Sequence, residues 1–202
     1  MDKINDFPEK TISGDGAVSE RFLDLGITRF REACRYVRRL PYGYNSDRDN
    51  LMILFKEGFG SCTTKHAVIA TLARELGLPI GKAIGIYAMT EALVTGTGAV
   101  LARYGLPYVP MVHCFLAGDG VRVDLTEGNR NGKNRPIDDF LHTEQVSADI
   151  SAKEEYLRYR KALHDHILSR RELQGIDLKT ILKAREEGIA LLRARISAES
   201  VA

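Results

Sequence analysis

The chain has 202 residues, of which 44% are hydrophobic and 28% are charged, and this composition excludes a disordered protein. Lysine and arginine number 29 against 27 acidic residues, so the net charge of +2 supplies no strong field for nucleic acid or an anionic membrane. No apolar run approaches the roughly 18–20 residues that span a bilayer, and residues 1–6 lack the apolar stretch of a signal peptide. Three cysteines are too few for a disulfide framework. We therefore expect a cytoplasmic protein with reduced thiols and with neither a nucleic-acid nor a membrane partner.

The sequence pattern predicts mainly helices over residues 1–76. Residues 1–18 have no periodicity and are expected to form a loose leader. Apolar residues at helical spacing predict a helix over about 20–40, and a short second helix is expected over 48–56. The third helix, over about 62–76, is marked at both ends: Ser61 is a candidate N-cap, and Gly77 and Pro79 follow where the helix must stop. Because few of its residues are polar, we expect this helix to lie at the centre of the fold.

Over residues 80–196 the sequence pattern predicts a sheet, followed by further helices. The expected elements are, in chain order, a strand over 80–89, a short helix over 99–104, a hairpin of 111–117 and 121–125, a polar loop over 127–136, and helices over 154–173 and 178–196. Helices on both sides of an antiparallel sheet define the α+β class. We expect one catalytic domain over 19–150, with residues 151–202 packed on it as a C-terminal helical extension.

Cys62 is the residue that points most directly to chemistry. It opens the third helix, directly after a glycine-containing segment, Gly58-Phe59-Gly60. A thiol at a helix N-terminus lies at the positive end of the helix dipole, beside unpaired backbone N–H groups, and both favour the nucleophilic thiolate. The alternative is a small buried core residue, because free cysteine is among the most buried residue types. Cys34 and Cys114 both lie on apolar faces, and we expect them to belong to the core.

His113 and Asp124 are predicted to lie on the same face of the hairpin. A turn at Gly118-Asp119 would pair Leu116 with Val121, form one continuous apolar face, and set His113 directly opposite Asp124. A turn at Asp119-Gly120 would move the register by two residues and leave His113 and Asp124 as diagonal neighbours. A carboxylate beside an imidazole fixes its tautomer and leaves the other ring nitrogen free to face a thiolate. The alternative is a polar cross-strand pair on a solvated face.

Other candidate residues carry weaker signals. His66 follows Cys62 by one helical turn and could line the same site, and Lys65 is expected on the helix surface, where its charge would favour a thiolate. No motif predicts a cofactor or a metal site. The segment Gly77-Leu78-Pro79-Ile80-Gly81-Lys82-Ala83 has the wrong glycine spacing for a phosphate-binding loop, and its last residue is not Ser or Thr. His164 and His166 are two residues apart on a helix, so they cannot bind one ion together.

Three motifs, in the order Cys, His and Asp, resemble those of the transglutaminase-like superfamily. They are Gly60-Ser61-Cys62-Thr63-Thr64-Lys65-His66 with its exit at Gly77-Leu78-Pro79, then His113-Cys114-Phe115, and then Val123-Asp124-Leu125-Thr126. The resemblance covers roughly residues 41–128. It implies a papain/transglutaminase-like core, in which a nucleophile helix packs on an antiparallel sheet, here with a C-terminal helical hairpin. It also implies a Cys62–His113–Asp124 catalytic triad.

The sequence departs from the superfamily in one respect that matters for catalysis. It contains no tryptophan, so an indole cannot stabilise the oxyanion. The backbone N–H of Cys62 supplies one donor, and Tyr44 and Asn45 are the candidates for a second. We expect a thiol hydrolase or acyltransferase that forms a thioester on Cys62 and acts on a peptide or another amide. The alternative is a catalytically inactive domain of the same fold that serves as a protein-binding module.

Overall fold

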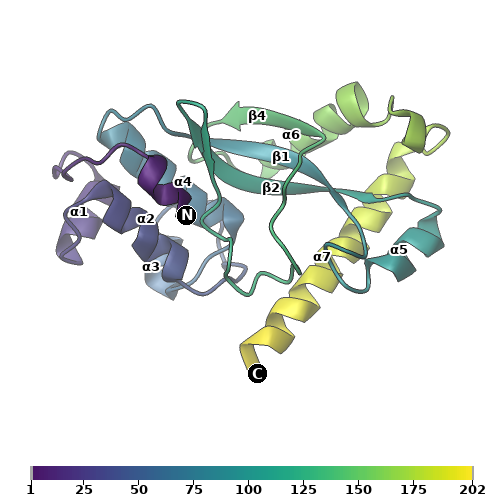
Figure 1. The fold of residues 1–202 in the computed structure, drawn as a ribbon, viewed down its shortest axis with the longest axis horizontal. Helices are drawn as coiled ribbons and strands as arrows, with labels where there is room; N and C mark the ends of the chain where they lie inside the picture. Colours follow the sequence, from purple (N-terminus) through teal and green to yellow (C-terminus); the bar gives the residue numbers. More distant parts are fainter. Residues whose placement is uncertain (1, 202) are drawn as a thin grey trace. The chain divides into compact units, whose positions relative to one another are not determined.

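The computed structural model describes residues 2–201 and has a mixed α+β architecture (Figure 1). Its four strands form one sheet in the order β3-β2-β1-β4. No helix among the described residues is both long and apolar enough to cross a bilayer. The elements are, in chain order, η1 (Lys3–Asp6), α1 (Ala17–Asp24), α2 (Phe30–Arg39), α3 (Ile53–Glu57), α4 (Cys62–Glu75), β1 (Gly81–Met89), α5 (Thr97–Tyr104), β2 (Val109–Gly118), β3 (Val121–Val123), β4 (His142–Val146), α6 (Ala152–Ala162), η2 (Leu163–Ile167), η3 (Arg171–Leu173) and α7 (Leu178–Val201).

The single helix expected over 20–40 is wrong, because the chain forms α1 and α2 instead. The break lies at Gly26, whose φ of +73° belongs to the left-handed region. The amide of Gly26 donates to the carbonyl of Leu23, and the amide of Ile27 donates to that of Phe22, at 2.8 and 2.9 Å. These two bonds form a Schellman motif, which ends a helix and satisfies its last carbonyls. Apolar spacing continues through the break, so periodicity alone hides it.

The edge strand β4 was not predicted from the sequence. Its residues, His142-Thr143-Glu144-Gln145-Val146, include a single aliphatic side chain, and half-buried and exposed positions alternate along it. An edge strand is hydrogen-bonded on one side only and needs no apolar face of its own. The other three strands and the short helix α5 lie where the sequence predicts them, within a few residues.

The β2–β3 hairpin has the second of the two predicted registers. Leu116 pairs with Val123 and Gly118 pairs with Val121, so the turn is formed by Asp119 and Gly120. Both turn residues have positive φ, +50° and +76°, as a type I′ hairpin requires. The pairing of Leu116 with Val121, and with it the directly opposed His113 and Asp124, is therefore wrong. Asp124 directly follows the last residue of β3.

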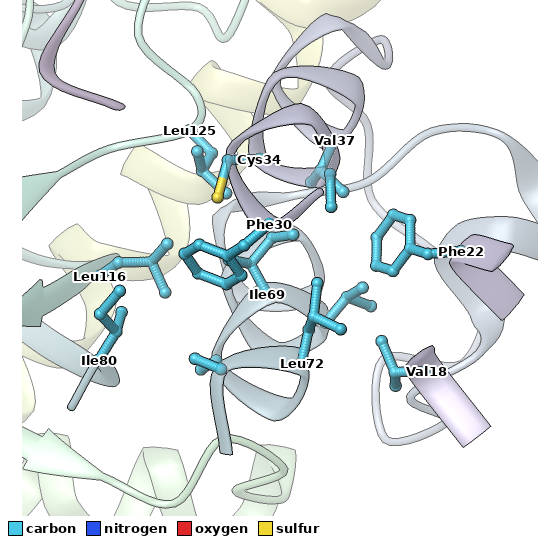
Figure 2. Close-up of a cluster of buried hydrophobic side chains, with 14 of the residues drawn as sticks. Val18, Phe22, Phe30, Cys34, Val37, Ile69, Leu72, Ile80, Leu116 and Leu125 are labelled. Atoms are coloured by element: carbon cyan, nitrogen blue, oxygen red, sulfur yellow. The ribbon is translucent and has the colours of Figure 1, made fainter. Parts of the chain in front are cut away.

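The contacts divide the chain into two units, and these differ from the predicted domains. The first unit contains residues 1–84, 114–129 and 145–151. Its core gathers side chains of α1, α2 and α4 with residues of the sheet, as Figure 2 shows for Phe22, Phe30, Ile69, Leu72 and Leu116. The expected loose leader over 1–18 is wrong for the described residues 2–18, because Ile4, Phe7 and Ile12 are buried in this core.

The second unit contains residues 85–113, 130–144 and 152–202 and has its own apolar core. Helices α5 and α7 pack together in it. A Cβ atom added at Gly188 of α7 would lie 2.7 Å from Cε of Met89, so the helix backbone approaches β1 closely at this glycine. The C-terminal helices thus share a core with the segment 85–113, which the sequence analysis places in the catalytic domain.

Glu75, the last residue of α4, supplies the cap that α1 lacks. Gly16 has no side chain to cap α1, and the Glu75 carboxylate instead accepts hydrogen bonds from the Ser19 amide at 2.7 Å and from the Ser19 hydroxyl at 2.6 Å. We expect Glu75→Ala to lower the free energy of unfolding by about 1–2 kcal/mol, the usual value of a lost cap. Chemical denaturation measures it, with exposed Glu20→Ala as the control. Equal stability of the two variants would contradict the capping role.

Candidate active site

Cys62 is the first residue of α4, as the sequence predicts. Ser61 precedes it with extended backbone (φ −81°, ψ 177°) and makes no side-chain cap, so the helix entrance is not closed by the Ser61 hydroxyl. Cys62 is partly exposed, whereas Cys34 and Cys114 are fully buried. Burial raises the pKa of the Cys34 thiol far above its usual range. Cys114 lies against the Thr63 hydroxyl, with 3.7 Å between sulfur and oxygen. Of the three cysteines, Cys62 is therefore the one accessible to a substrate.

Gly60 fixes the approach of the chain to Cys62. A short parallel bridge joins Tyr42 to Gly60, with hydrogen bonds from the Gly60 amide to the Pro41 carbonyl (3.1 Å) and from the Gly43 amide to the Gly60 carbonyl (3.3 Å). A Cβ atom at position 60 would lie 2.4 Å from a methyl group of Leu54. A side chain at position 60 would therefore displace Leu54 of α3, and the backbone bridge holds the segment around Tyr42 beside the start of α4.

Tyr42 is the residue near Cys62 that the sequence did not reveal. Its hydroxyl is in hydrogen-bond contact with both the backbone amide and the thiol of Cys62. The pKa of this phenol lies well above its usual range, because burial disfavours the phenolate and the charge of a Cys62 thiolate adds to that effect. Tyr42 therefore stays protonated and keeps an O–H donor at the nucleophile.

The two residues expected to supply a second oxyanion donor have other surroundings. The amide group of Asn45 donates to Glu57 (2.8 Å) and to the Phe59 carbonyl (2.9 Å), and its oxygen accepts from the Thr64 hydroxyl (2.7 Å). Asn45 is thus a brace for the loop that precedes α4. Tyr44 is 39% exposed and lies edge-on to the Tyr42 ring. These contacts do not direct the Asn45 or Tyr44 side chain to the Cys62 thiol. Tyr42 therefore replaces them as the candidate for the second oxyanion donor.

His66 is a buried structural residue. Its Nδ1 lies 2.6 Å from the Cys62 carbonyl oxygen, and its Nε2 lies 2.8 Å from the Leu125 amide. The carbonyl requires a proton on Nδ1 and the amide requires a lone pair on Nε2, so the ring is the neutral Nδ1–H tautomer. Asp124 Oδ1 is 3.5 Å from Nε2, but this contact is not an ion pair because Nε2 carries no proton. His66 joins the first turn of α4 to the segment after β3.

Asp124 is held by its own turn. Its Oδ1 accepts hydrogen bonds from the Thr126 amide and the Thr126 hydroxyl, both at 2.7 Å. The carboxylate is partly accessible, with 14% of its side chain exposed. This arrangement fixes the direction of the carboxylate and keeps it charged, because both partners are donors.

Lys65 is not on the helix surface, contrary to the sequence expectation, but is fully buried. Its ammonium group donates to the Arg38 carbonyl (3.4 Å), to the Leu40 carbonyl and to the Asn129 side chain (3.0 Å). It therefore caps the C-terminal end of α2 from α4. Burial lowers the pKa of Lys65 to about 8, against the attraction of Asp124.

His113 belongs to the second unit, whereas Cys62, Tyr42 and Asp124 belong to the first. It lies on β2 and is 2% exposed. Its ring lies edge-on to that of Tyr87, with 6.4 Å between the centroids. Within the first unit, the structure brings Cys62 together with Tyr42, and Asp124 together with Thr126 and His66. Among residues 2–201, no group of three or more His, Cys, Asp or Glu side chains could hold a metal ion.

Comparisons with protein-family models, with curated proteins and with solved structures found no match.

Proposed function

We propose that this chain is a cysteine-dependent acyl-transfer enzyme of the transglutaminase-like type. The observation that carries the proposal is the environment of Cys62. Its thiol is partly exposed, it is the first residue of the buried helix α4, and the protonated Tyr42 phenol lies beside it. A helix N-terminus favours the thiolate, and an adjacent O–H donor is what an oxyanion needs. The order of the Cys62, His113 and Asp124 motifs gives independent support, because it matches the order in that superfamily.

The proposed reaction proceeds through a thioester. His113 takes the proton of the Cys62 thiol, and the sulfur attacks the carbonyl carbon of an amide. The tetrahedral oxyanion accepts hydrogen bonds from the Cys62 amide and from the Tyr42 hydroxyl. The carbon–nitrogen bond then breaks, and His113 returns the proton to the departing amine. Water, or a second amine, attacks the thioester and releases Cys62, with His113 again taking and returning the proton.

Asp124 is assigned the role of orienting His113. A carboxylate that accepts the second ring N–H fixes the tautomer and stabilises the imidazolium that forms during the reaction. The two hydrogen bonds from Thr126 support this role, because they leave the carboxylate charged and fixed in direction. The substrate class is a peptide or another amide, and we favour hydrolysis or transfer to a small amine over protein crosslinking.

Selective alkylation tests the proposal. With iodoacetamide near pH 6, where an ordinary thiol reacts slowly, we expect Cys62 to be modified at least about tenfold faster than Cys34 or Cys114. Mass spectrometry of the digested protein gives the rate at each cysteine. In urea the three rates should become similar, which controls for intrinsic peptide effects. Faster labelling of Cys114, or no selectivity in the folded protein, would contradict the enzyme and favour the binding module.

A further inference from the structure

A second candidate site lies in the first unit, at the opposite end of α4 from Cys62. It is a groove of about 610 Å³ between the C-terminal turn of α4, the segment that leads into β1, and the chain at the end of β4. Arg74 is twelve residues after Cys62, which corresponds to about 18 Å along the helix axis. The groove is lined by Ala70, Arg74, Gly77, Leu78, Pro79, Ile80, Gly81, Lys82, Gln145, Val146, Ser147 and Ala148.

Lys82 is the unusual residue of this groove. It is 1% exposed, yet its ammonium nitrogen has no hydrogen-bond partner in the described part of the chain. A buried polar group without a hydrogen bond is unfavourable, and native proteins satisfy nearly all such groups with protein atoms, water or a bound molecule. The contrast with Lys65 is direct, because that equally buried lysine donates to three oxygens.

The charges around Lys82 leave an excess of positive charge. Arg74 lies on the exposed rim of the groove, and Asp149 follows the lining segment. The pKa of Asp149 lies below its usual range because Ser147 donates a hydrogen bond to it and because Arg74 and Lys82 attract its charge. The formal charges of Arg74, Lys82 and Asp149 therefore sum to +1, and the Asp149 carboxylate already accepts from Ser147. One further negative charge would balance this set.

We propose that this groove binds a small organic anion, whose carboxylate or phosphate group pairs with Lys82 and Arg74. The apolar side chains of Leu78, Ile80 and Val146 would contact the body of the molecule, and the volume is in the range of small-molecule sites. The site is not a nucleotide phosphate loop, because Gly81 begins a strand and not a helix. It is independent of Cys62, so it does not rest on the proposed enzyme.

Calorimetric titration with three probes tests this proposal. They are inorganic phosphate, octanoate, and octan-1-ol as the neutral analogue, all added to the full chain at constant ionic strength. We expect saturable binding of at least one anion and much weaker binding of the alcohol. Binding of phosphate alone would indicate a phosphate-bearing ligand, and tighter binding of octanoate a carboxylate with an apolar body. Lys82→Met should weaken anion binding at least about tenfold, equivalent to about 1.4 kcal/mol.

Two further variants keep the test decisive. Lys56→Met removes an exposed lysine of α3 and should bind the anion like the wild type. Arg74→Gln removes the second cation at an exposed position, so it should fold normally and also bind more weakly. Lys82→Met should melt no lower than the wild type without ligand, because it removes a buried ammonium group that makes no hydrogen bond. The proposal is overturned if neither anion saturates the wild type, if octan-1-ol binds equally well, or if Lys82→Met and Arg74→Gln both bind like the wild type.

Discussion

Under the proposed mechanism, Asp124→Asn should slow the reaction of Cys62 with an amide substrate by about 10²–10⁴-fold, and His113→Ala should slow it at least as much. The asparagine side chain has nearly the same shape and still accepts from Thr126, so the turn after β3 should survive. In the proposed triad, this variant loses the negative charge that stabilises the imidazolium. Without that partner, the thiolate of Cys62 is also less favoured, and its pKa should rise.

The pH dependence of Cys62 alkylation measures this effect without knowledge of the substrate. The curve should move to higher pH in Asp124→Asn and in His113→Ala, and the double variant should be little worse than His113→Ala, because the pair acts as a unit. Asp119→Asn is the matched control, since it changes an exposed acid at the tip of the same hairpin, where asparagine tolerates the positive φ. A curve moved by His113→Ala but not by Asp124→Asn would mean that another group orients the imidazole. A curve moved by neither would refute the triad.

Lys65→Met should lower the free energy of unfolding by about 2 kcal/mol. The methionine fills much of the same space, but the Asn129 side-chain oxygen loses its donor, and the Arg38 and Leu40 carbonyls keep only the Asn129 amide group, at 2.7 and 3.4 Å. A buried polar group left unsatisfied costs about 1–3 kcal/mol, and the desolvation of the ammonium, which the substitution removes, offsets part of the total loss. A loss of this size would be a large fraction of the stability of a domain of this length.

Denaturant titration of Lys65→Met against Lys56→Met separates burial from the loss of one positive charge. The exposed Lys56 variant should stay within about 0.5 kcal/mol of the wild type. The wild type should also gain stability from Lys65 as the pH rises from about 8 towards 10.4, because the folded state, with a pKa of about 8, binds fewer protons than the unfolded chain. Lys65→Met should lack this gain. Equal stability of the two variants at pH 7 would show that the Asn129 amide group alone satisfies the Arg38 and Leu40 carbonyls.

The sequence by itself determined the features that depend on local signals. The bounds of α4 follow from Ser61 before it and from Gly77 and Pro79 after it, and the apolar periodicity separated the buried Cys34 and Cys114 from the thiol at the helix start. The sequence predicted two possible turns for the hairpin, and one of them, Asp119-Gly120, is the turn that forms. Helix caps, turns and apolar periodicity depend on residues close together in the chain, so a single sequence is enough to predict them.

Only the tertiary structure decided which residues surround Cys62 and where the units divide. Tyr42 reaches the thiol because a backbone bridge joins it to Gly60, and no pattern around residue 42 signals that contact. Lys65, which was expected on the helix surface, is buried and its ammonium group has three acceptors. Lys82 is also buried, and its ammonium group has no hydrogen-bond partner among the described residues. The polar strand β4 carries no local signal, because its register comes from its neighbour in the sheet. These outcomes depend on contacts between residues far apart in the chain, and such contacts form only when the chain folds.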